Sequence, residues 1–438
     1  MKPEGAVRGT FLKGRQMGLI VQKFGGSSLA DPACLRRVAA RVLETRRAGH
    51  DVVVVVSAMG DTTDALIELA HQVNSSPSDR EMDMLMSTGE QVSVAVLSMA
   101  LHVMGVEAVS LTGAQAGIRT DAAHRKAKIL RVNPARIRRH LREGRIVIVA
   151  GFQGLTPLDD IATLGRGGSD TTAVALAAAL RAERCQIFTD VEGVYSADPR
   201  VVPDARKLKE IAYDEMLELA SLGARVLMSR SVEFAKKYGV RIEVLSSFVK
   251  APGTLVKEEV ADMEDIIVRG ISADQDQVKL TIGHVPDRPG MAARIFRELA
   301  AANINIDMIV QNTSEQGITD ISFTIHRDDQ PRAREVLEKA ARSLKVRHVN
   351  VDQDIAKVSV VGVGMRGHSG VAYRVFHALA ENNINILMIA TSEIKISVVV
   401  RKKLADKAMR VLHETFSLHK APRRPAVKKG ARNARKKS

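Results

Sequence analysis

The sequence predicts an α/β protein whose mostly parallel sheet is sandwiched by helices and is followed by two small α+β modules. Three observations lead to this prediction. Between Met17 and Leu255, short apolar runs alternate with amphipathic helical patterns, as in a parallel sheet with crossover helices. The run Val52–Val56 is continuously apolar, as expected of a strand covered on both faces. Finally, 12 of the 20 residues at 290–309 recur 80 positions later, which indicates a duplicated unit.

The individual elements follow from apolar periodicity. Short apolar runs bounded by turn residues indicate strands, and longer runs with a period of 3.6 residues indicate helices. The predicted strands are Ile20–Val21, Val52–Val56, Ala108–Val109, Ile146–Ala150, Gln186–Phe188 and Ile242–Leu245, and helices are predicted at Pro32–Ala48 and Ser169–Leu180. Each repeat copy is predicted as a strand, a turn with Gly, an amphipathic helix and a strand that starts at Asn303 or Asn383.

Composition narrows the class of protein. The chain has 438 residues, of which 45% are hydrophobic, enough for a large core in roughly two to four domains. Its two cysteines, Cys34 and Cys185, argue against a disulfide framework and fit a reducing compartment, so we expect a cytoplasmic protein. No run reaches about 18 consecutive apolar residues, so no membrane span is expected.

The net charge of +15 is concentrated at the chain ends. Nine Lys and Arg residues and no acid lie from Lys420 to the C-terminus, and residues 1–16 carry a net charge of +3. A solvated, disordered end explains such a run, and binding to nucleic acid or another acidic partner is the alternative. We expect translation to begin at Met17. The predicted domains are 17–255, 266–345 and 355–418, with disordered tails at 1–16 and 419–438.

Two glycine-rich stretches indicate transfer of a phosphoryl group. Lys23–Ser28 (KFGGSS) follows the first strand, and its adjacent glycines let backbone N–H groups approach a phosphate closely. Gly165–Asp170 (GRGGSD) repeats this chemistry at a helix start and adds an arginine and a carboxylate. A fixed ammonium such as Lys23 stabilises a phosphoryl group in transfer, and Arg166 suits a bidentate grip on a carboxylate. Capping of the helix is the alternative role of Asp170.

Further polar segments are candidates for ligand contacts. Ser57–Asp64 contains two acids, two threonines and a serine, which suit either a polar substrate or a helix cap. Ser87–Glu90 is predicted to start a helix, where Glu90 either binds a ligand or compensates the helix dipole. Thr189–Arg200 is a polar loop after a strand, where α/β proteins bind ligands. No His or Cys cluster has metal-ligand spacing, so no protein-ligated metal is predicted.

As a set, these motifs resemble those of the aspartate kinases, members of the amino acid kinase family that carry tandem C-terminal ACT domains. The resemblance covers roughly residues 17–418. It implies the amino acid kinase fold followed by two ferredoxin-like ACT modules. The implied reaction is ATP-dependent phosphorylation of the side-chain carboxylate of L-aspartate to 4-phospho-L-aspartate, the first step towards lysine, threonine and methionine. Mg²⁺ would be held mainly by the nucleotide phosphates. The motifs are Lys23–Ser28, Val56–Gly60, Gly89–Glu90, Gly165–Asp170 and Thr189–Arg200.

The resemblance also implies roles for single residues. Lys23 and Asp170 would be catalytic: Lys23 contacts the phosphoryl group, and Asp170 organises the cations around it. Arg166 would hold a carboxylate of aspartate and Glu90 its α-ammonium, and Arg225 replaces a lysine that family members commonly carry near the nucleotide. The implied aspartate site is Ser57, Thr63, Glu90, Arg166 and Ser169. The implied ATP site is Lys23, Gly25, Gly26, Ser27, Thr189, Asp190, Tyr195, Arg200 and Arg225.

For the repeat, the resemblance implies feedback inhibition by lysine, threonine or both. An amino acid bound between the modules would shift the population toward the arrangement that it contacts better. A dimer surface is the alternative role of the repeat. The resemblance implies a homo-oligomer or an α2β2 assembly whose regulatory subunit starts at Met263. The implied effector residues are Asp287, Pro289, Gly290, Met291, Ala292, Gln311, Asn312, Thr313, Asn385, Ile386 and Ser392.

Two other functions stay open at this point. Another carboxylate or nucleotide kinase of the same fold is disfavoured by Glu90 and by the repeat. A catalytically silent amino acid sensor, tethered to nucleic acid by its tail, is disfavoured by the intact set Lys23, Arg166 and Asp170.

Overall fold

The computed structural model describes residues 17–221, 226–258, 260, 267–312, 317–344, 348–365 and 368–420. Arg225, Thr313, Met263, residues 1–16 and residues 421–438 lie outside these residues, so the roles predicted for them stay predictions. The chain forms two compact units. The first comprises residues up to Tyr195 together with Lys207–Val260, and the second comprises Ser196–Arg206 and the chain from Ala261 onward.

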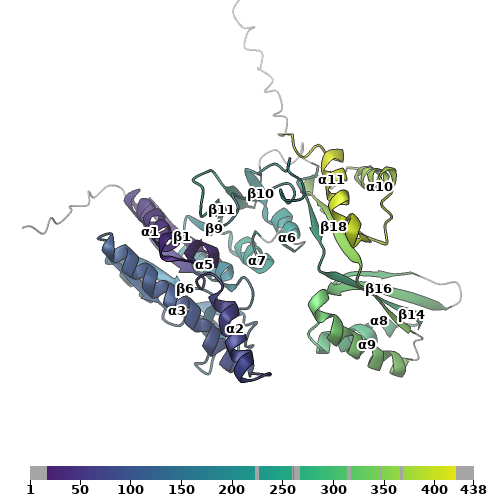
Figure 1. Ribbon diagram of the computed structural model, residues 1–438, viewed down its shortest axis with the longest axis horizontal. Coiled ribbons are helices and arrows are strands. Elements are labelled where there is room, and N and C mark those ends of the chain that lie inside the picture. Colours follow the sequence, from purple (N-terminus) through teal and green to yellow (C-terminus); the bar gives the residue numbers. More distant parts are fainter. Residues whose placement is uncertain are drawn as a thin grey trace, which may run out of the picture. The chain divides into compact units, whose positions relative to one another are not determined.

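An eight-stranded sheet forms the middle of the first unit (Figure 1). Neighbouring strands of this sheet pair in parallel, except for the antiparallel pair of β11 (Ile242–Ser246) and β12 (Thr254–Lys257). All six predicted strands belong to this sheet, which confirms the predicted fold class. In spatial order the strands are β10 (Glu210–Ala212), β12 (Thr254–Lys257), β11 (Ile242–Ser246), β9 (Arg184–Thr189), β1 (Met17–Phe24), β2 (His50–Val56), β6 (Ile146–Ala150) and β3 (Ala108–Leu111).

Helices cover both faces of this sheet. α1 (Pro32–Arg47) and α3 (Asp79–Val103) share an apolar cluster with Val52, Val54 and Val56 of β2. Because successive strand residues point to opposite faces, Val53 and Val55 face the other layer, where α5 (Gly168–Leu180) packs against β1, β2 and β9. The remaining helices of this unit are α2 (Thr62–Val73), α4 (Ala135–Arg142), α6 (Tyr213–Ser221) and α7 (Ser229–Tyr238).

The prediction that a helix starts at Ser87 is wrong, because α3 already begins at Asp79. Gly89 does not break the helix: a Cβ at this position would lie 2.8 Å from the Ala58 side chain, so the close approach of the two segments requires glycine. Among the described residues, α3 is the one helix long and apolar enough to cross a membrane. Half of its apolar window is buried in the protein, as in a core helix.

Besides β6, the chain between β3 and α5 forms a second, four-stranded sheet. This sheet was not predicted from the sequence, because strands of three or four residues carry little periodicity. Its order is β5 (Ile129–Val132), β4 (Ile118–Thr120), β7 (Gln153–Leu155) and β8 (Ile161–Thr163).

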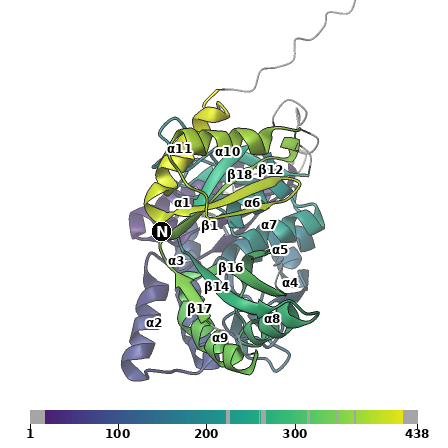
Figure 2. The ribbon, with the colours of Figure 1, turned by 90° about the vertical axis from the view of Figure 1, so that its right-hand side faces the viewer.

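The second unit contains two antiparallel four-stranded sheets, each covered by two helices, and Figure 2 shows α8 and α9 beside β14, β16 and β17. The duplicated glycines Gly290 and Gly370 both take left-handed backbone angles (φ 89° and 96°) directly before a helix. One sheet is β15 (Ile306–Gln311), β16 (Ile318–His326), β14 (Gln277–Pro286) and β17 (His348–Asp352), with α8 (Met291–Ala301) and α9 (Gln330–Leu344). The other is β13 (Gly270–Asp274), β18 (Ile355–Val361), β20 (Lys395–Arg401) and β19 (Met388–Thr391), with α10 (Val371–Glu381) and α11 (Ala405–Thr415).

Part of the segment predicted as the catalytic domain belongs to this second unit. Ala197 and Val202 are buried in the apolar core formed by β13, β18, β20, α10 and α11. Ser196 accepts a hydrogen bond from the Ile271 backbone at 2.7 Å, and its Oγ lies 3.0 Å from His413 Nε2. Segment 196–206 therefore leaves the first unit and returns to it at Lys207.

An ion pair with one buried partner joins the two sheets of the second unit. Lys357 of β18 is 2% exposed, and its ammonium contacts the carboxylate of Asp307 on β15, whose side chain is 34% exposed. Next to this pair, Met308 of β15 shares an apolar cluster with Met388 and Val399 of the other sheet. The two sheets are thus held together by both apolar and charged contacts.

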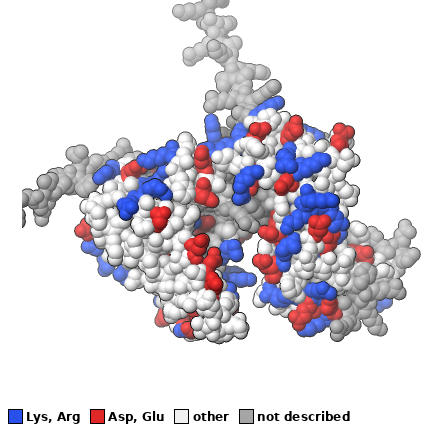
Figure 3. Space-filling model, in the orientation of Figure 1, with Lys and Arg blue, Asp and Glu red and all other residues white. Residues whose placement is uncertain are grey.

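Acidic and basic side chains are interspersed on the face of the molecule that Figure 3 shows. Wide patches of a single sign are not seen among the described residues of that face, in keeping with the concentration of positive charge in the chain ends.

Asp307→Ala should destabilise the second unit, because it leaves the buried Lys357 ammonium without its charge partner. We expect the free energy of unfolding of this unit to fall by about 2 kcal/mol, measured by denaturant unfolding. Glu335→Ala, which removes the exposed i,i+4 pair with Lys339, is the matched control and should leave the transition unchanged. Equal transitions for both variants would contradict a structural role of the pair between Lys357 and Asp307.

Candidate active site

The loops predicted to bind phosphate leave the sheet at one edge. Phe24 at the end of β1 lies opposite Val56 of β2 and Phe188 of β9. The segments that follow are cross-linked: Ser57 N donates to Phe24 O, and Gly60 N donates to Gly26 O, both at 3.1 Å. The carboxyl edge of a parallel sheet is where α/β proteins bind ligands.

Lys23 and Asp170 form the charged centre of this edge. Lys23 precedes Phe24, which packs with α1 and α3, so its side chain points to the opposite face, toward α5. Its Nζ lies 2.7 Å from Oδ1 of Asp170, the third residue of α5, and the two side chains are 13% and 9% exposed. Asp170 Oδ1 has no well-aligned hydrogen bond within the described residues, so the two groups touch as an ion contact. Nearby, burial raises the pKa of the Cys185 thiol and keeps it neutral.

Glycine is required where the loops approach each other. A Cβ on Gly26 would lie 2.9 Å from Ala58 O and 3.0 Å from Gly60 O, and neither backbone atom can move cheaply. Gly165 and Gly167 have left-handed φ angles of 77° and 70°, so they reverse the chain on both sides of Arg166, which is exposed.

Glu90 brings an unpaired carboxylate oxygen to the same edge. It is the twelfth residue of α3 and is 3% exposed. Its Oε1 accepts a hydrogen bond from Ala58 N at 3.1 Å, whereas Oε2 is buried with no partner among the described residues. Burial raises the pKa of Glu90 to about 7. A buried acceptor of this kind is matched by a ligand that donates hydrogen bonds and carries positive charge.

The other predicted aspartate contacts lie on neighbouring elements. Ser57 and Thr63 are partly exposed after β2 and at the start of α2. Ser169 is 6% exposed on α5. It packs against Gly151, the residue directly after β6: a Cβ added to this glycine would lie 2.7 Å from the Ser169 Oγ.

Sequence reasoning missed Phe152. This residue has a left-handed φ of 67°, and its backbone N donates to Thr172 Oγ1 of α5 at 3.2 Å. Its Cα would lie 3.3 Å from a Cβ on Gly168, so it packs against the start of α5. The available signal was its place just after the predicted strand Ile146–Ala150.

The predicted nucleotide residues divide between the two units. Thr189 ends β9, and its Oγ1 donates to Asp190 Oδ1 at 3.0 Å. Tyr195 forms a bridge with Lys207 in the first unit. Arg200 belongs to the second unit, where its Nη2 lies 2.7 Å from Asp198 Oδ2.

Comparison with known proteins identifies the family. The amino acid kinase family matches residues 18–246, and ACT domains match residues 280–342 and 358–416. The chain belongs to the amino acid kinase family. Its relatives place it among the aspartate kinases. Aspartate kinase of Pseudomonas putida is 54% identical over 92% of this chain and 98% of its own length. The aspartokinase of Corynebacterium glutamicum is 51% identical over 92% of this chain and 97% of its own.

Solved aspartokinase structures share the architecture. Escherichia coli aspartokinase III in complex with aspartate and ADP, in its R-state, has a TM-score of 0.78 and is 28% identical. The same enzyme in complex with lysine and aspartate, in its T-state, has a TM-score of 0.72 at 28% identity. Both comparisons cover 91% of this chain and 99% of the other.

The predicted effector residues lie on the two ACT domains. Met291 and Ala292 pack against the core of the first, and Ile386 packs against the core of the second. Asp287 starts the turn before α8, where its backbone N donates to Gly317 O at 2.9 Å. The remaining described members are exposed: Pro289, Gly290, Gln311, Asn312, Asn385 and Ser392.

Glu90 should make stability depend on pH. Its carboxyl has an ordinary pKa of 4.5 and a pKa of about 7 in the folded protein, so the folded state binds this proton more tightly. The contribution of Glu90 to stability therefore falls as pH rises from 4.5 to 7. Glu90→Gln carries no such charge, and its free energy of unfolding relative to wild type should rise by up to about 3 kcal/mol between pH 5 and pH 8. Urea unfolding without ligand tests this, and a difference that stays constant with pH would contradict the shifted pKa.

Proposed function

We propose that this aspartate kinase transfers the γ-phosphoryl group of ATP to the side-chain carboxylate of L-aspartate, giving 4-phospho-L-aspartate and ADP. One observation carries the proposal: an ammonium suited to a phosphoryl group and an unpaired buried carboxylate suited to an amino acid ammonium lie at the same sheet edge. These groups are Lys23 Nζ and Glu90 Oε2. The E. coli relative described with aspartate and ADP supports this pair of ligands.

The reaction needs little covalent chemistry from the protein. The substrate carboxylate is already deprotonated, so its oxygen attacks the γ-phosphorus without a general base. The new O–P bond forms as the P–O bond to ADP breaks, and the electron pair leaves with ADP. Catalysis is then positioning together with neutralisation of charge. Lys23 would stabilise the phosphoryl oxygens in transit, and the positive end of the α5 dipole favours the same negative charge.

Recognition of aspartate divides among groups of opposite charge. Glu90 would pair with the α-ammonium, because its Oε2 has no hydrogen-bond donor among the residues that the structure describes. Arg166 would bind a carboxylate through its guanidinium, and Ser169 would add a hydroxyl at the start of α5.

Mg²⁺ fits this site as a companion of the nucleotide. Among the described residues, no group of three or more His, Cys, Asp or Glu side chains could hold a metal by itself. Mg²⁺ typically takes one or two carboxylates and completes its shell with phosphates and water. Asp170 is the buried carboxylate that would face it, and the ion would neutralise phosphate charge.

The test is a coupled ADP-release assay with L-aspartate, with L-glutamate and without acceptor. We expect aspartate-dependent ADP formation, and Lys23→Ala should lower kcat by about two to three orders of magnitude. Lys250→Ala, which removes an exposed pair with Glu44 in the same unit, is the control and should keep wild-type turnover. Absence of aspartate-dependent ADP in the wild type would refute the proposed reaction, and normal turnover of Lys23→Ala would remove Lys23 from its role.

We also propose that lysine, threonine or both inhibit the enzyme through the ACT domains. The E. coli relative described with lysine supports an amino acid effector. Segment 196–206 offers a route for coupling, since it follows the loop Thr189–Tyr195 directly and packs into the core of the second unit. Movement of that core would pull on the loop, so effector and nucleotide would influence each other reciprocally.

Ser196→Ala should weaken inhibition and preserve catalysis. It removes the buried hydroxyl that contacts His413 Nε2 at 3.0 Å and accepts from Arg206 N at 2.9 Å. We expect a higher inhibitor concentration for half-inhibition, with the KM for aspartate unchanged. Ser397→Ala removes a buried serine contact with Ser359 inside the same unit. This variant should be inhibited at the same effector concentration as the wild type. Equal inhibition of all three proteins would argue against this route.

A further inference from the structure

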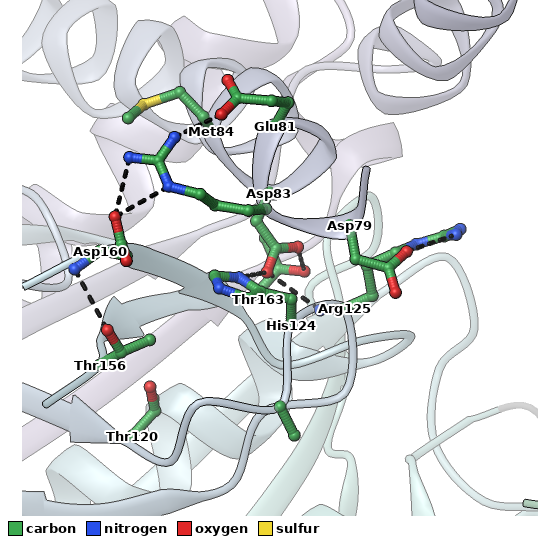
Figure 4. Close-up of polar contacts among 12 residues, drawn as sticks. Asp79, Glu81, Asp83, Met84, Thr120, His124, Arg125, Thr156, Asp160 and Thr163 are labelled. Carbon is green, nitrogen blue, oxygen red and sulfur yellow. Dashed lines mark hydrogen bonds and ion pairs between the residues drawn. The ribbon is translucent and has the colours of Figure 1, made fainter. Parts of the chain in front are cut away.

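A buried carboxylate outside the site described above binds two segments that lie next to one of its loops. Asp83 of α3 is fully buried, and Figure 4 shows its carboxylate facing His124, Arg125 and Thr163. Oδ2 accepts from His124 Nδ1 and from Arg125 N, each at 2.9 Å, and Oδ1 accepts from Thr163 Oγ1. Three donors from two segments distant in sequence thus converge on one side chain.

These bonds hold a strained backbone. Arg125 has a φ of 63°, a left-handed conformation that a residue with a Cβ adopts only under constraint. Its backbone N–H is the group that Asp83 binds, so the carboxylate stabilises this conformation directly.

The strained residue in turn abuts the loop that carries Arg166. The Arg125 carbonyl oxygen would lie 2.8 Å from a Cβ on Gly165, so the two backbones are in close contact. Ala127 N also donates to Thr163 O at 3.0 Å, two residues before Gly165. Because Gly165 reverses the chain immediately before Arg166, a shift of Arg125 would displace the arginine.

Arg230 also links the segment that contains Arg125 to the loop that carries Arg166. Its Nη1 donates to Leu164 O at 2.9 Å and its Nη2 to Ala127 O at 2.7 Å, so one guanidinium bridges both segments. Burial lowers the pKa of Arg230, partly offset by Asp121 and Glu233, and the group stays charged.

We propose that Asp83, with Arg230, is a positioning residue for the acceptor amino acid. By clamping segment 124–127 onto the turn at Gly165, it sets where Arg166 meets the substrate carboxylate. The inference deepens the proposed function and rests on it. Asp83 also lies on the buried face of α3 that carries Glu90, so both ends of an α-amino acid would be located from one helix.

The test compares two neighbouring acids of α3. Asp83→Ala removes both carboxylate oxygens, so the N–H groups of His124 and Arg125 and the hydroxyl of Thr163 lose their acceptor. Asp79→Ala is the matched control, because Asp79 is exposed and its carboxylate lies 3.3 Å from the side chain of the same Arg125. We would measure kcat, the KM for aspartate and for ATP, and the Kd of aspartate and of ADP by calorimetry.

Misplacement of Arg166 in Asp83→Ala should weaken the binding of aspartate at least about tenfold and leave the affinities for ATP and ADP within about twofold of wild type. Asp79→Ala should match wild type. A purely structural role would weaken the binding of both ligands together, and that outcome overturns the proposal, as does unchanged affinity for aspartate. If Asp83→Ala fails to fold, Arg230→Ala decides by the same measurements, since it loosens the same loop with Asp83 in place.

The design separates the two hypotheses. A wild-type enzyme that forms no ADP with aspartate would remove the proposed function. A wild-type enzyme that does so, with Asp83→Ala and Arg230→Ala equal to Asp79→Ala, would remove only the positioning role.

Discussion

The contact between Lys23 and Asp170 is the interaction on which the active site depends. Burial of two charges costs several kcal/mol of desolvation for each ion, so the pair is better explained by chemistry than by stability. Parallel pairing of β1 with β2 and β9 brings the ammonium to the sheet edge, and α5 brings the carboxylate. The glycines in the adjoining loops allow neighbouring backbone segments to pack closely beside this ion pair.

Two buried acids on one face of α3 have opposite hydrogen-bonding environments. Asp83 is saturated by three donors and acts on the backbone around it. Glu90 has one oxygen bound by Ala58 N and one that finds no partner in the described part of the chain, and burial raises its pKa. A saturated carboxylate stabilises its surroundings, whereas an unsatisfied one favours a cationic ligand. One helix therefore combines a structural and a chemical role.

The second unit is coupled to the first through the chain itself. Segment 196–206 contributes Ala197 and Val202 to an ACT-domain core, although it is flanked on both sides by residues of the kinase unit. Within that unit, the pair Lys357–Asp307 links the two ACT sheets. An amino acid bound to these domains would act on elements that are already connected by packing and charge.

The parallel sheet, the duplicated module and the glycine loops were predictable from the amino-acid sequence, because periodicity, repetition and strand-end glycines are local signals. The sequence also indicated Lys23, Gly165–Asp170 and Glu90 as chemically important. Three features became visible only in the folded chain: Glu90 lies well inside a long helix, segment 196–206 packs with the ACT domains, and Asp83 clamps Arg125. The reason is physical: burial, unpaired oxygens and close backbone contacts arise between segments far apart in the chain, and no local pattern records them.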